Sequence, residues 1–208
     1  MDTMLTPAVI VDYGMGNLRS VEKAITSLGG SARISGDVDV VRRAECLILP
    51  GVGAFGDAMV NLRQSGLDSA IREAVEEGKP LLGLCLGLEL LFSESEEFGR
   101  HQGLALIPGS VKRFQDPDLR VPHVGWNQIE SIRPDPLLQN LHEGTYFYFV
   151  HSYYVEPESP AHVLAWTQYG RRFCSIAGFG NVWGAQFHPE KSQGAGKQLL
   201  RNFLEFRG

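Results

Sequence analysis

The chain has 208 residues, of which 43% are hydrophobic and 21% are charged, and its formal net charge is −5. This is the composition of an ordinary globular protein, and we expect residues 1–208 to form a single domain. No Lys or Arg cluster is longer than a pair, which argues against nucleic acid as a partner. No apolar stretch approaches the roughly 20 residues that cross a bilayer, so we expect no membrane segment.

The N-terminus and the cysteines both indicate a cytoplasmic protein. The first residues run from an acid directly into a strand-like segment, without the pattern of a signal peptide. Three scattered cysteines, Cys46, Cys85 and Cys174, are too few for a disulfide framework or a zinc site. A reducing compartment fits this usage, and we predict no metal and no cofactor.

The first half of the chain alternates between strand-like and helix-like segments. Short apolar runs that predict buried strands occur at residues 8–11, 46–49 and 81–84. Apolar residues at helical spacing predict helices at 17–28, 67–75 and 86–92, the first with Asn17 as its cap. This alternation is typical of a parallel sheet covered by helices on both faces.

The second half is richer in strands. Candidate strands lie at residues 104–107, 111–114, 146–150, 163–167, 173–177 and 182–187, before a last helix at 195–206. The turn around Gly178–Gly180 suggests an antiparallel hairpin. We therefore predict an α/β fold with a mostly parallel central sheet, flanking helices and additional antiparallel strands in the C-terminal half.

The sequence GLCLG at residues 83–87 follows an apolar strand and precedes a helix. This is the layout of a nucleophile elbow with cysteine in place of serine, in which the glycines permit close backbone approach. The turn would place the Cys85 sulfur at a helix N-terminus, which favours thiolate over thiol. The alternative is an ordinary buried cysteine, which is the interpretation we favour for Cys46 and Cys174.

A cysteine nucleophile needs a base, and His188 is the best candidate. In extended backbone, residues two apart face the same side, so His188 and Glu190 would point together across Pro189. A carboxylate beside an imidazole fixes its tautomer and stabilises the imidazolium. The alternative is a strand-end histidine paired with a surface acid. Other histidines in polar contexts, predicted to be surface residues, are His101, His142 and His162.

Two backbone amides are candidates for stabilising a developing negative charge. The amide of Leu86 follows the nucleophile, and the glycines of PGVG at residues 50–53 could turn the amide near Val52 inward. A plain Pro-Gly turn is an equally good interpretation of the second segment alone.

With these motifs the chain resembles class I, triad-type glutamine amidotransferases, and within them the glutaminase subunits of imidazole glycerol phosphate synthase. The resemblance covers nearly the whole chain. Its segments are DYGMGNL (12–18), PGVG (50–53), GLCLG (83–87), PHVGWN (122–127), VHSYY (150–154) and HPE (188–190). The elbow and HPE are shared across class I, whereas DYGMGN and PHVGWN are more specific to the subunit.

The resemblance implies a flavodoxin-like fold and a set of roles. Cys85 would attack the side-chain amide of glutamine, His188 would transfer protons, and Glu190 would orient His188. Residues implied in holding glutamine are Gly51, Gly53, Glu89, Ser152 and Tyr153. Residues implied at the interface with a cyclase partner, a (β/α)₈ barrel in a heterodimer, are Asn17, His123, Trp126 and Asn127.

A synthase that uses ammonia needs its glutaminase docked over a dry conduit, because ammonia in neutral water is mostly protonated. Pro122, Val124 and Trp126 could form an apolar docking patch, although core packing explains Trp126 equally well. The aromatic run at residues 146–149 predicts a buried strand. One residue departs from the resemblance, because the family usually has Gln where this chain has Glu89.

Two other functions remain open from the sequence. The chain could serve another synthase, such as anthranilate or pyridoxal phosphate synthase, because the triad is shared. It could instead be a non-catalytic phosphate or nucleotide binder, supported by Gly14 and Gly16 after a strand. Arg19 occupies the place of the third glycine, which weakens that second alternative.

Overall fold

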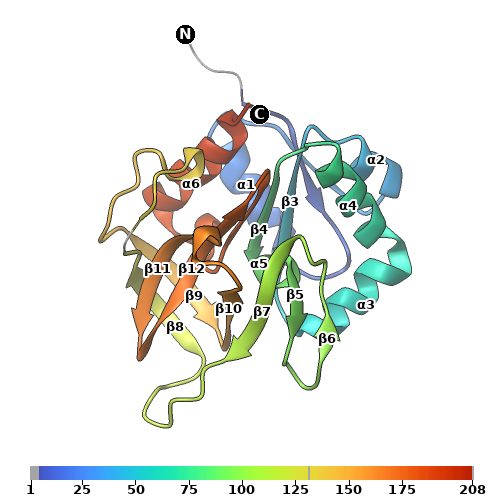
Figure 1. Ribbon diagram of the computed structural model, residues 1–208. Coiled ribbons are helices and arrows are strands. Elements are labelled where there is room, and N and C mark those ends of the chain that lie inside the picture. Colours follow the sequence, from blue (N-terminus) through green and yellow to red (C-terminus); the bar gives the residue numbers. More distant parts are fainter. Residues whose placement is uncertain (1–4, 131, 208) are drawn as a thin grey trace.

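The computed structural model describes residues 5–130 and 132–207 (Figure 1). Five parallel strands lie in the order β2-β1-β3-β4-β13, four of them from the first half of the chain and β13 from its C-terminal part. These are β1 (Ala8–Val11), β2 (Ala32–Ser35), β3 (Cys46–Gly51), β4 (Leu81–Cys85) and β13 (Val182–Ala185). Parallel pairing brings the carboxyl ends of the strands to one edge, where Gly51 of β3 is in register with Cys85 of β4.

Helices cover both faces of this parallel region (Figure 1). Side chains alternate along each strand, so β1 and β3 contribute to two separate cores. One core includes α3 (Phe55–Ser65), α4 (Leu67–Glu76) and the short helices α2 (Val38–Arg42) and α5 (Leu86–Leu90). The other includes α1 (Leu18–Thr26) and α6 (Gln193–Glu205). Among the described residues, no helix is long and apolar enough to cross a membrane.

Six further strands extend the same sheet, mostly in antiparallel pairs. These are β5 (Phe92–Ser95), β6 (His101–Gln102), β7 (Ile107–Arg113), β10 (Tyr153–Pro157), β11 (Val163–Tyr169) and β12 (Arg171–Phe179). A separate antiparallel pair is formed by β8 (His123–Gln128) and β9 (Tyr146–His151). Single 3₁₀ turns occur at Pro136–Leu138, Pro160–His162 and Pro189–Lys191.

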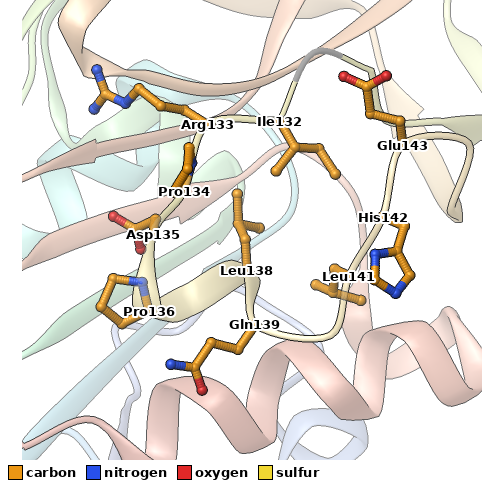
Figure 2. A pocket seen from close by; sticks show the side chains of 10 residues that line it. All are labelled: Ile132, Arg133, Pro134, Asp135, Pro136, Leu138, Gln139, Leu141, His142 and Glu143. Carbon is orange, nitrogen blue, oxygen red and sulfur yellow. The ribbon is translucent and has the colours of Figure 1, made fainter.

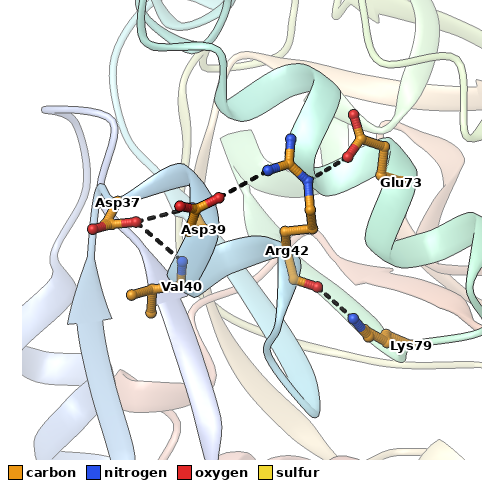
Figure 3. Close-up of polar contacts among 6 residues, drawn as sticks. All are labelled: Asp37, Asp39, Val40, Arg42, Glu73 and Lys79. Atoms are coloured by element: carbon orange, nitrogen blue, oxygen red, sulfur yellow. Dashed lines mark hydrogen bonds and ion pairs between the residues drawn. The ribbon is translucent and has the colours of Figure 1, made fainter.

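An ion-pair cluster connects α2 with α4 and with the segment just before β4 (Figure 3). Arg42 pairs with Asp39 at 3.0 Å and with Glu73, and Lys79 donates to the Arg42 carbonyl. Asp37 caps α2 by accepting from the Asp39 amide at 2.8 Å. These groups are half-exposed, so the cluster contributes modestly to stability and does not form a site.

The predicted fold class is confirmed, including the hairpin of β12 and β13 across Phe179 and Val182. Several boundaries were wrong. The helix predicted at 86–92 ends at Leu90, because Phe92 begins β5. The strand predicted at 104–107 is irregular until Ile107, where β7 begins. Asn17 occupies the N-cap of α1 but makes no side-chain capping bond.

Candidate active site

The turn from β4 into α5 has the strained geometry of a nucleophile elbow. Cys85 has φ +55° and ψ −111°, a conformation that non-glycine residues rarely adopt. A Cβ on Gly87 would lie 1.7 Å from the Leu49 carbonyl oxygen, and a Cβ on Gly83 would lie 2.6 Å from the Gly87 oxygen. The two glycines are therefore required by backbone contact, as predicted from the sequence.

The Cys85 sulfur lies in a nearly closed environment, because the residue is 7% exposed. Its thiol donates to the Val150 carbonyl oxygen at 3.6 Å. Burial raises the pKa of the Cys85 thiol, the charges of Glu89 and Glu190 raise it further, and a backbone hydrogen bond from Leu86 lowers it. The expectation that the helix N-terminus favours thiolate was wrong, since one short helix does not outweigh this burial.

His188 and Glu190 form a buried pair, with Nδ1 and Oε1 3.0 Å apart. Their side chains are 6% and 2% exposed, which excludes a surface pairing. The prediction attributed the contact to an extended strand, but β13 ends at Ala185 and the 3₁₀ turn Pro189–Lys191 brings the two together. With Nδ1–H donating to Glu190, the neutral imidazole keeps Nε2 as the proton acceptor.

The backbone around His188 is itself held by hydrogen bonds. Its amide donates to the Tyr148 carbonyl at 2.9 Å. The Ser192 hydroxyl donates to the His188 carbonyl at 2.6 Å and accepts from the Tyr148 amide at 3.0 Å. These bonds connect the turn that carries the base to β9.

Cys85 and His188 line one cavity of about 740 Å³, a size suited to a small-molecule substrate. Its wall also contains residues from β3, α5, β5, β7 and β10 or the adjoining loops. They include the predicted site residues Val52, Gly53, Leu86, Glu89, Ser152 and Tyr153. Gly51, Glu190 and Asn17 line a smaller adjoining hollow that also reaches His188.

The segment after β3 is supported from the loop that follows β1. The Tyr13 hydroxyl donates to the Pro50 carbonyl at 2.9 Å. A Cβ on Gly51 would lie 2.5 Å from that hydroxyl, so only glycine fits there. Gly53 has φ +107°, which also favours glycine. Sequence analysis missed the role of Tyr13, whose signal was its place in the DYGMGN segment.

Glu89 faces the cavity from α5 and is 6% exposed. The Gln186 amide donates to its Oε1 at 2.9 Å. Burial raises the pKa of Glu89 to about 8, and the charge of Glu97 adds to that shift, whereas the Gln186 bond opposes it. Sequence analysis did not identify Glu97 or Gln186, because neither lies in a recognised motif and their burial depends on tertiary packing.

Two predicted interface residues point away from the outer face of β8, His123 being buried and Asn127 partly buried. His123 is 3% exposed, stacks on Tyr169 and contacts His151. The prediction that His123 lies on the surface that meets a partner is therefore wrong. Asn127 is partly buried and donates to the Gln168 carbonyl at 2.9 Å. Both face inward because alternate residues of β8 point to opposite sides of the strand.

The other face of β8 presents apolar side chains to solvent. Val124 is 56% exposed, Trp126 is 47% exposed and Pro122 just before the strand is exposed. Tyr146 of β9 is also exposed, whereas Phe147 and Phe149 are buried, so the strand predicted at 146–149 is buried on one side. The core-packing alternative for Trp126 is therefore excluded. Asn17 is exposed as well.

A second hollow lies in the loop between β8 and β9 (Figure 2). It is lined by Ile132, Arg133, Pro134, Asp135, Pro136, Leu138, Gln139, Leu141, His142 and Glu143. The Asp135 carboxylate is already engaged with the Leu137 amide and the Trp183 indole. This hollow contains none of the predicted catalytic groups. Among the described residues, no cluster of three or more His, Cys, Asp or Glu side chains could hold a metal ion.

Comparison with known proteins identifies the family. The model of the family Glutamine amidotransferase class-I matches residues 9–206. Imidazole glycerol phosphate synthase subunit HisH of Syntrophotalea carbinolica is 55% identical over 94% of this chain and 98% of its own. The same subunit of Moorella thermoacetica is 52% identical over 97% and 95%.

Solved structures support the fold alone, because their sequences are more distant. A structure named PurLQS from Thermotoga maritima superposes with a TM-score of 0.77 at 21% identity, over 97% of this chain and 98% of that one. A crystal structure of a glutamine amidotransferase superposes with a TM-score of 0.75 at 23% identity, over 95% and 97%. From the family match and these relatives, the chain belongs to the class I glutamine amidotransferase family.

Proposed function

We propose that the chain is the glutaminase subunit of imidazole glycerol phosphate synthase and that Cys85, His188 and Glu190 are its catalytic triad. The observation that carries the triad is the convergence of the strained Cys85 elbow and His188 on one cavity, with His188 held by buried Glu190. The synthase assignment is supported by relatives about half identical over nearly their full length. The triad assignment and the synthase assignment each rest on more than one motif.

The reaction begins with deprotonation of Cys85. Because burial disfavours the free thiolate, the proton passes to Nε2 of His188 as the sulfur attacks the amide carbon of glutamine. Backbone amides of Val52 and Leu86 are the proposed donors to the resulting oxyanion. Collapse breaks the C–N bond, and His188 returns its proton so that ammonia leaves and a thioester remains.

The second half of the reaction uses water. His188 accepts a proton from water, whose oxygen attacks the thioester carbon, and the C–S bond breaks to give glutamate. The proton then returns to the Cys85 sulfur, which restores the resting enzyme. Glu190 stabilises the imidazolium in both halves, because it accepts from Nδ1 in a buried site.

The substrate would lie along the cavity wall between the nucleophile and β10. Its proposed contacts are Gly51, Gly53, Glu89, Ser152 and Tyr153. Among the described residues the thiol donates a hydrogen bond to the Val150 carbonyl and none to His188, so catalysis requires a rearrangement that brings the sulfur and the imidazole together. Apo active sites commonly have such loose catalytic contacts.

The ammonia would pass to a cyclase subunit, a (β/α)₈ barrel that makes imidazole glycerol phosphate and AICAR in histidine biosynthesis. The proposed docking surface is the exposed apolar face of Pro122, Val124 and Trp126, together with Asn17. Docking over this face would place the partner beside the cavity, because Pro122 also lines it. A covered route keeps ammonia unprotonated.

An ammonia-release assay with separately purified subunits tests the proposal. Glutamine hydrolysis should rise at least tenfold when the cyclase subunit and its substrate are added, and the cyclase product should form with glutamine as the nitrogen source. A chain that produces ammonia only with the partner of another synthase would assign it to that synthase. A chain that produces none with any partner would contradict the enzymatic function.

A further inference from the structure

One wall of the active-site cavity is a bend where the chain passes from one sheet to the other. β9 belongs to the two-stranded sheet with β8, β10 belongs to the eleven-stranded sheet, and Ser152 is the residue between them. Residues 150–153 all line the cavity. The Val150 carbonyl accepts from the Cys85 thiol, and Ser152 and Tyr153 are proposed contacts of glutamine. The position of this bend therefore determines how the wall faces the substrate.

The side chain of His151 crosses this bend. Its Nδ1 lies 2.6 Å from the Tyr153 carbonyl oxygen in β10, and its Nε2 lies 3.0 Å from Nδ1 of His123 in β8. Because a carbonyl oxygen can only accept, Nδ1 donates to Tyr153 and Nε2 accepts from His123. A single imidazole thus joins the first residue of β10 to the sheet that the chain has just left.

The surroundings of His151 are apolar and strengthen these two hydrogen bonds. The residue is 5% exposed, and its ring centroid lies 5.4, 5.7 and 5.1 Å from those of Phe114, Phe149 and Phe173. Hydrogen bonds in such a setting are stronger than at a surface and more costly to lose. Burial lowers the pKa of His151 to about 3, so the ring is neutral at pH 7. With both nitrogens engaged, His151 is suited to hold backbone in place and not to exchange protons with the substrate.

His123 is itself fixed, so it gives His151 a rigid donor. It is 3% exposed, and its ring stacks on Tyr169 with centroids 3.9 Å apart and on Phe149 with centroids 5.0 Å apart. Its Nε2 lies 3.3 Å from the Asn127 amide nitrogen, which donates to it. The orientation of the His151 ring is therefore set from β8, on the side away from the substrate.

On the basis of the proposed glutaminase function, we propose that His151, held by His123, is a positioning residue that fixes the bend at Ser152 and thereby the wall that contacts glutamine. Without the hydrogen bond from Nδ1, Ser152 and Tyr153 would occupy a wider range of positions, and glutamine would bind more weakly. The catalytic triad lies on other elements and would be unaffected. The expected signature is a higher KM at a nearly unchanged kcat.

Steady-state ammonia release by the complete synthase complex tests this role with two substitutions of one residue. His151→Phe keeps the aromatic packing but has neither nitrogen, and it should raise the KM for glutamine by about 10-fold or more, with kcat within about 3-fold. His151→Asn retains a donor at the position of Nδ1, so its KM should stay within about 3-fold of the wild type. His162→Phe, whose ring packs on Phe179 outside the cavity, is the matched control and should change neither constant.

Amide hydrogen exchange reports on the bend without depending on turnover. In His151→Phe the peptide that contains residues 150–154 should exchange faster, whereas peptides from α6 should exchange as in the wild type. If His151→Phe does not fold, His123→Phe provides the same comparison, because it retains the stacking on Tyr169 but lacks the donor to His151. An unchanged KM or unchanged exchange in the phenylalanine variant, or an equal rise of KM in His151→Asn, would overturn the inference.

The wild-type complex separates this inference from the proposed function. Its ammonia release tests the function, and the response of KM and of hydrogen exchange to the substitutions tests the role of His151. An active wild-type complex whose KM does not respond to His151→Phe would reject the positioning role alone. A wild-type complex that releases no ammonia would reject the proposed function, and the exchange comparison would still show whether His151 fixes the bend.

Discussion

His123 Nδ1 lies 3.0 Å from His151 Nε2, in a buried hydrogen bond between β8 and β9. Its direction follows from its neighbours. His151 Nδ1 lies 2.6 Å from the Tyr153 carbonyl, which can only accept, so that nitrogen carries the proton and Nε2 accepts from His123. His123 Nε2 in turn lies 3.3 Å from the Asn127 amide nitrogen. Both rings are fully satisfied only when neutral.

This histidine pair predicts a loss of stability in weak acid. Burial lowers the pKa of His123 to about 4 and that of His151 to about 3. In the unfolded chain both histidines have a pKa near 6.5, so they bind protons at a higher pH than in the folded protein. Their contribution to stability is therefore fully present above about pH 6.5 and is lost as the pH decreases toward 4. The loss is about 1.4 kcal/mol per pH unit for each histidine.

Denaturant titrations at pH 7.5 and pH 5.5 measure this effect. The difference in free energy of unfolding between the two pH values should be smaller in His123→Gln, because glutamine cannot be protonated in this range. His142→Gln, on an exposed loop, serves as the control and should keep the wild-type difference. An unchanged difference in His123→Gln would mean that other groups cause the acid sensitivity.

Glu190→Gln tests the role of the carboxylate that orients His188. The substitution preserves shape but removes the charge that stabilises the imidazolium, so we expect kcat to fall by about 10²-fold or more with little change in KM. The assay is steady-state ammonia release in the presence of the partner. Glu205→Gln, in the surface pair with Arg201, should retain normal activity. Normal kcat in Glu190→Gln would exclude the orienting role.

Gly87→Ala tests whether the elbow depends on close backbone approach. The added Cβ would lie 1.7 Å from the Leu49 carbonyl, so β3 or α5 must shift and stability should fall by at least about 3 kcal/mol. Gly194→Ala in α6 is the matched control, because its Cβ would meet nothing within 4 Å. Thermal unfolding compares the two variants. Similar melting temperatures would refute the steric argument.

Trp126→Ala tests the docking surface. Trp126 is half-exposed on the outer face of β8, so its truncation should leave the fold intact and weaken partner association by about 10-fold or more. Titration calorimetry with the cyclase subunit measures the affinity. Phe179→Ala removes an equally exposed aromatic at the β12–β13 turn and should not affect binding. Equal effects of the two substitutions would argue against a specific interface.

Much of the fold could be predicted because its parallel strands are continuous apolar runs. The runs at 46–49 and 81–84 correspond to β3 and β4 without ambiguity. Short amphipathic elements were missed, such as β2 and α2, since four or five residues show too little periodicity. The separate pairing of β8 with β9 depends on contacts between distant segments, which local patterns do not reveal.

In the candidate site, too, some features could be predicted from the sequence and others could not. The elbow cysteine was evident because Gly83 and Gly87 mark a turn that admits no side chain there. The burial of Glu97 and the inward position of His123 were not evident, because an acidic loop and a single histidine look the same at a surface and in an interior. The raised pKa of Cys85 also depends on tertiary burial that no motif encodes.

Labelling by a glutamine-like electrophile tests the central claim most directly, because it reports which sulfur is the nucleophile. In the complex with the cyclase subunit, peptide mass spectrometry should find one label, on Cys85, and excess glutamine should prevent it. Cys85→Ser should remain folded, take up no label and release no ammonia from glutamine. A label on Cys46 or Cys174 instead of Cys85, or full ammonia release by Cys85→Ser, would contradict the account.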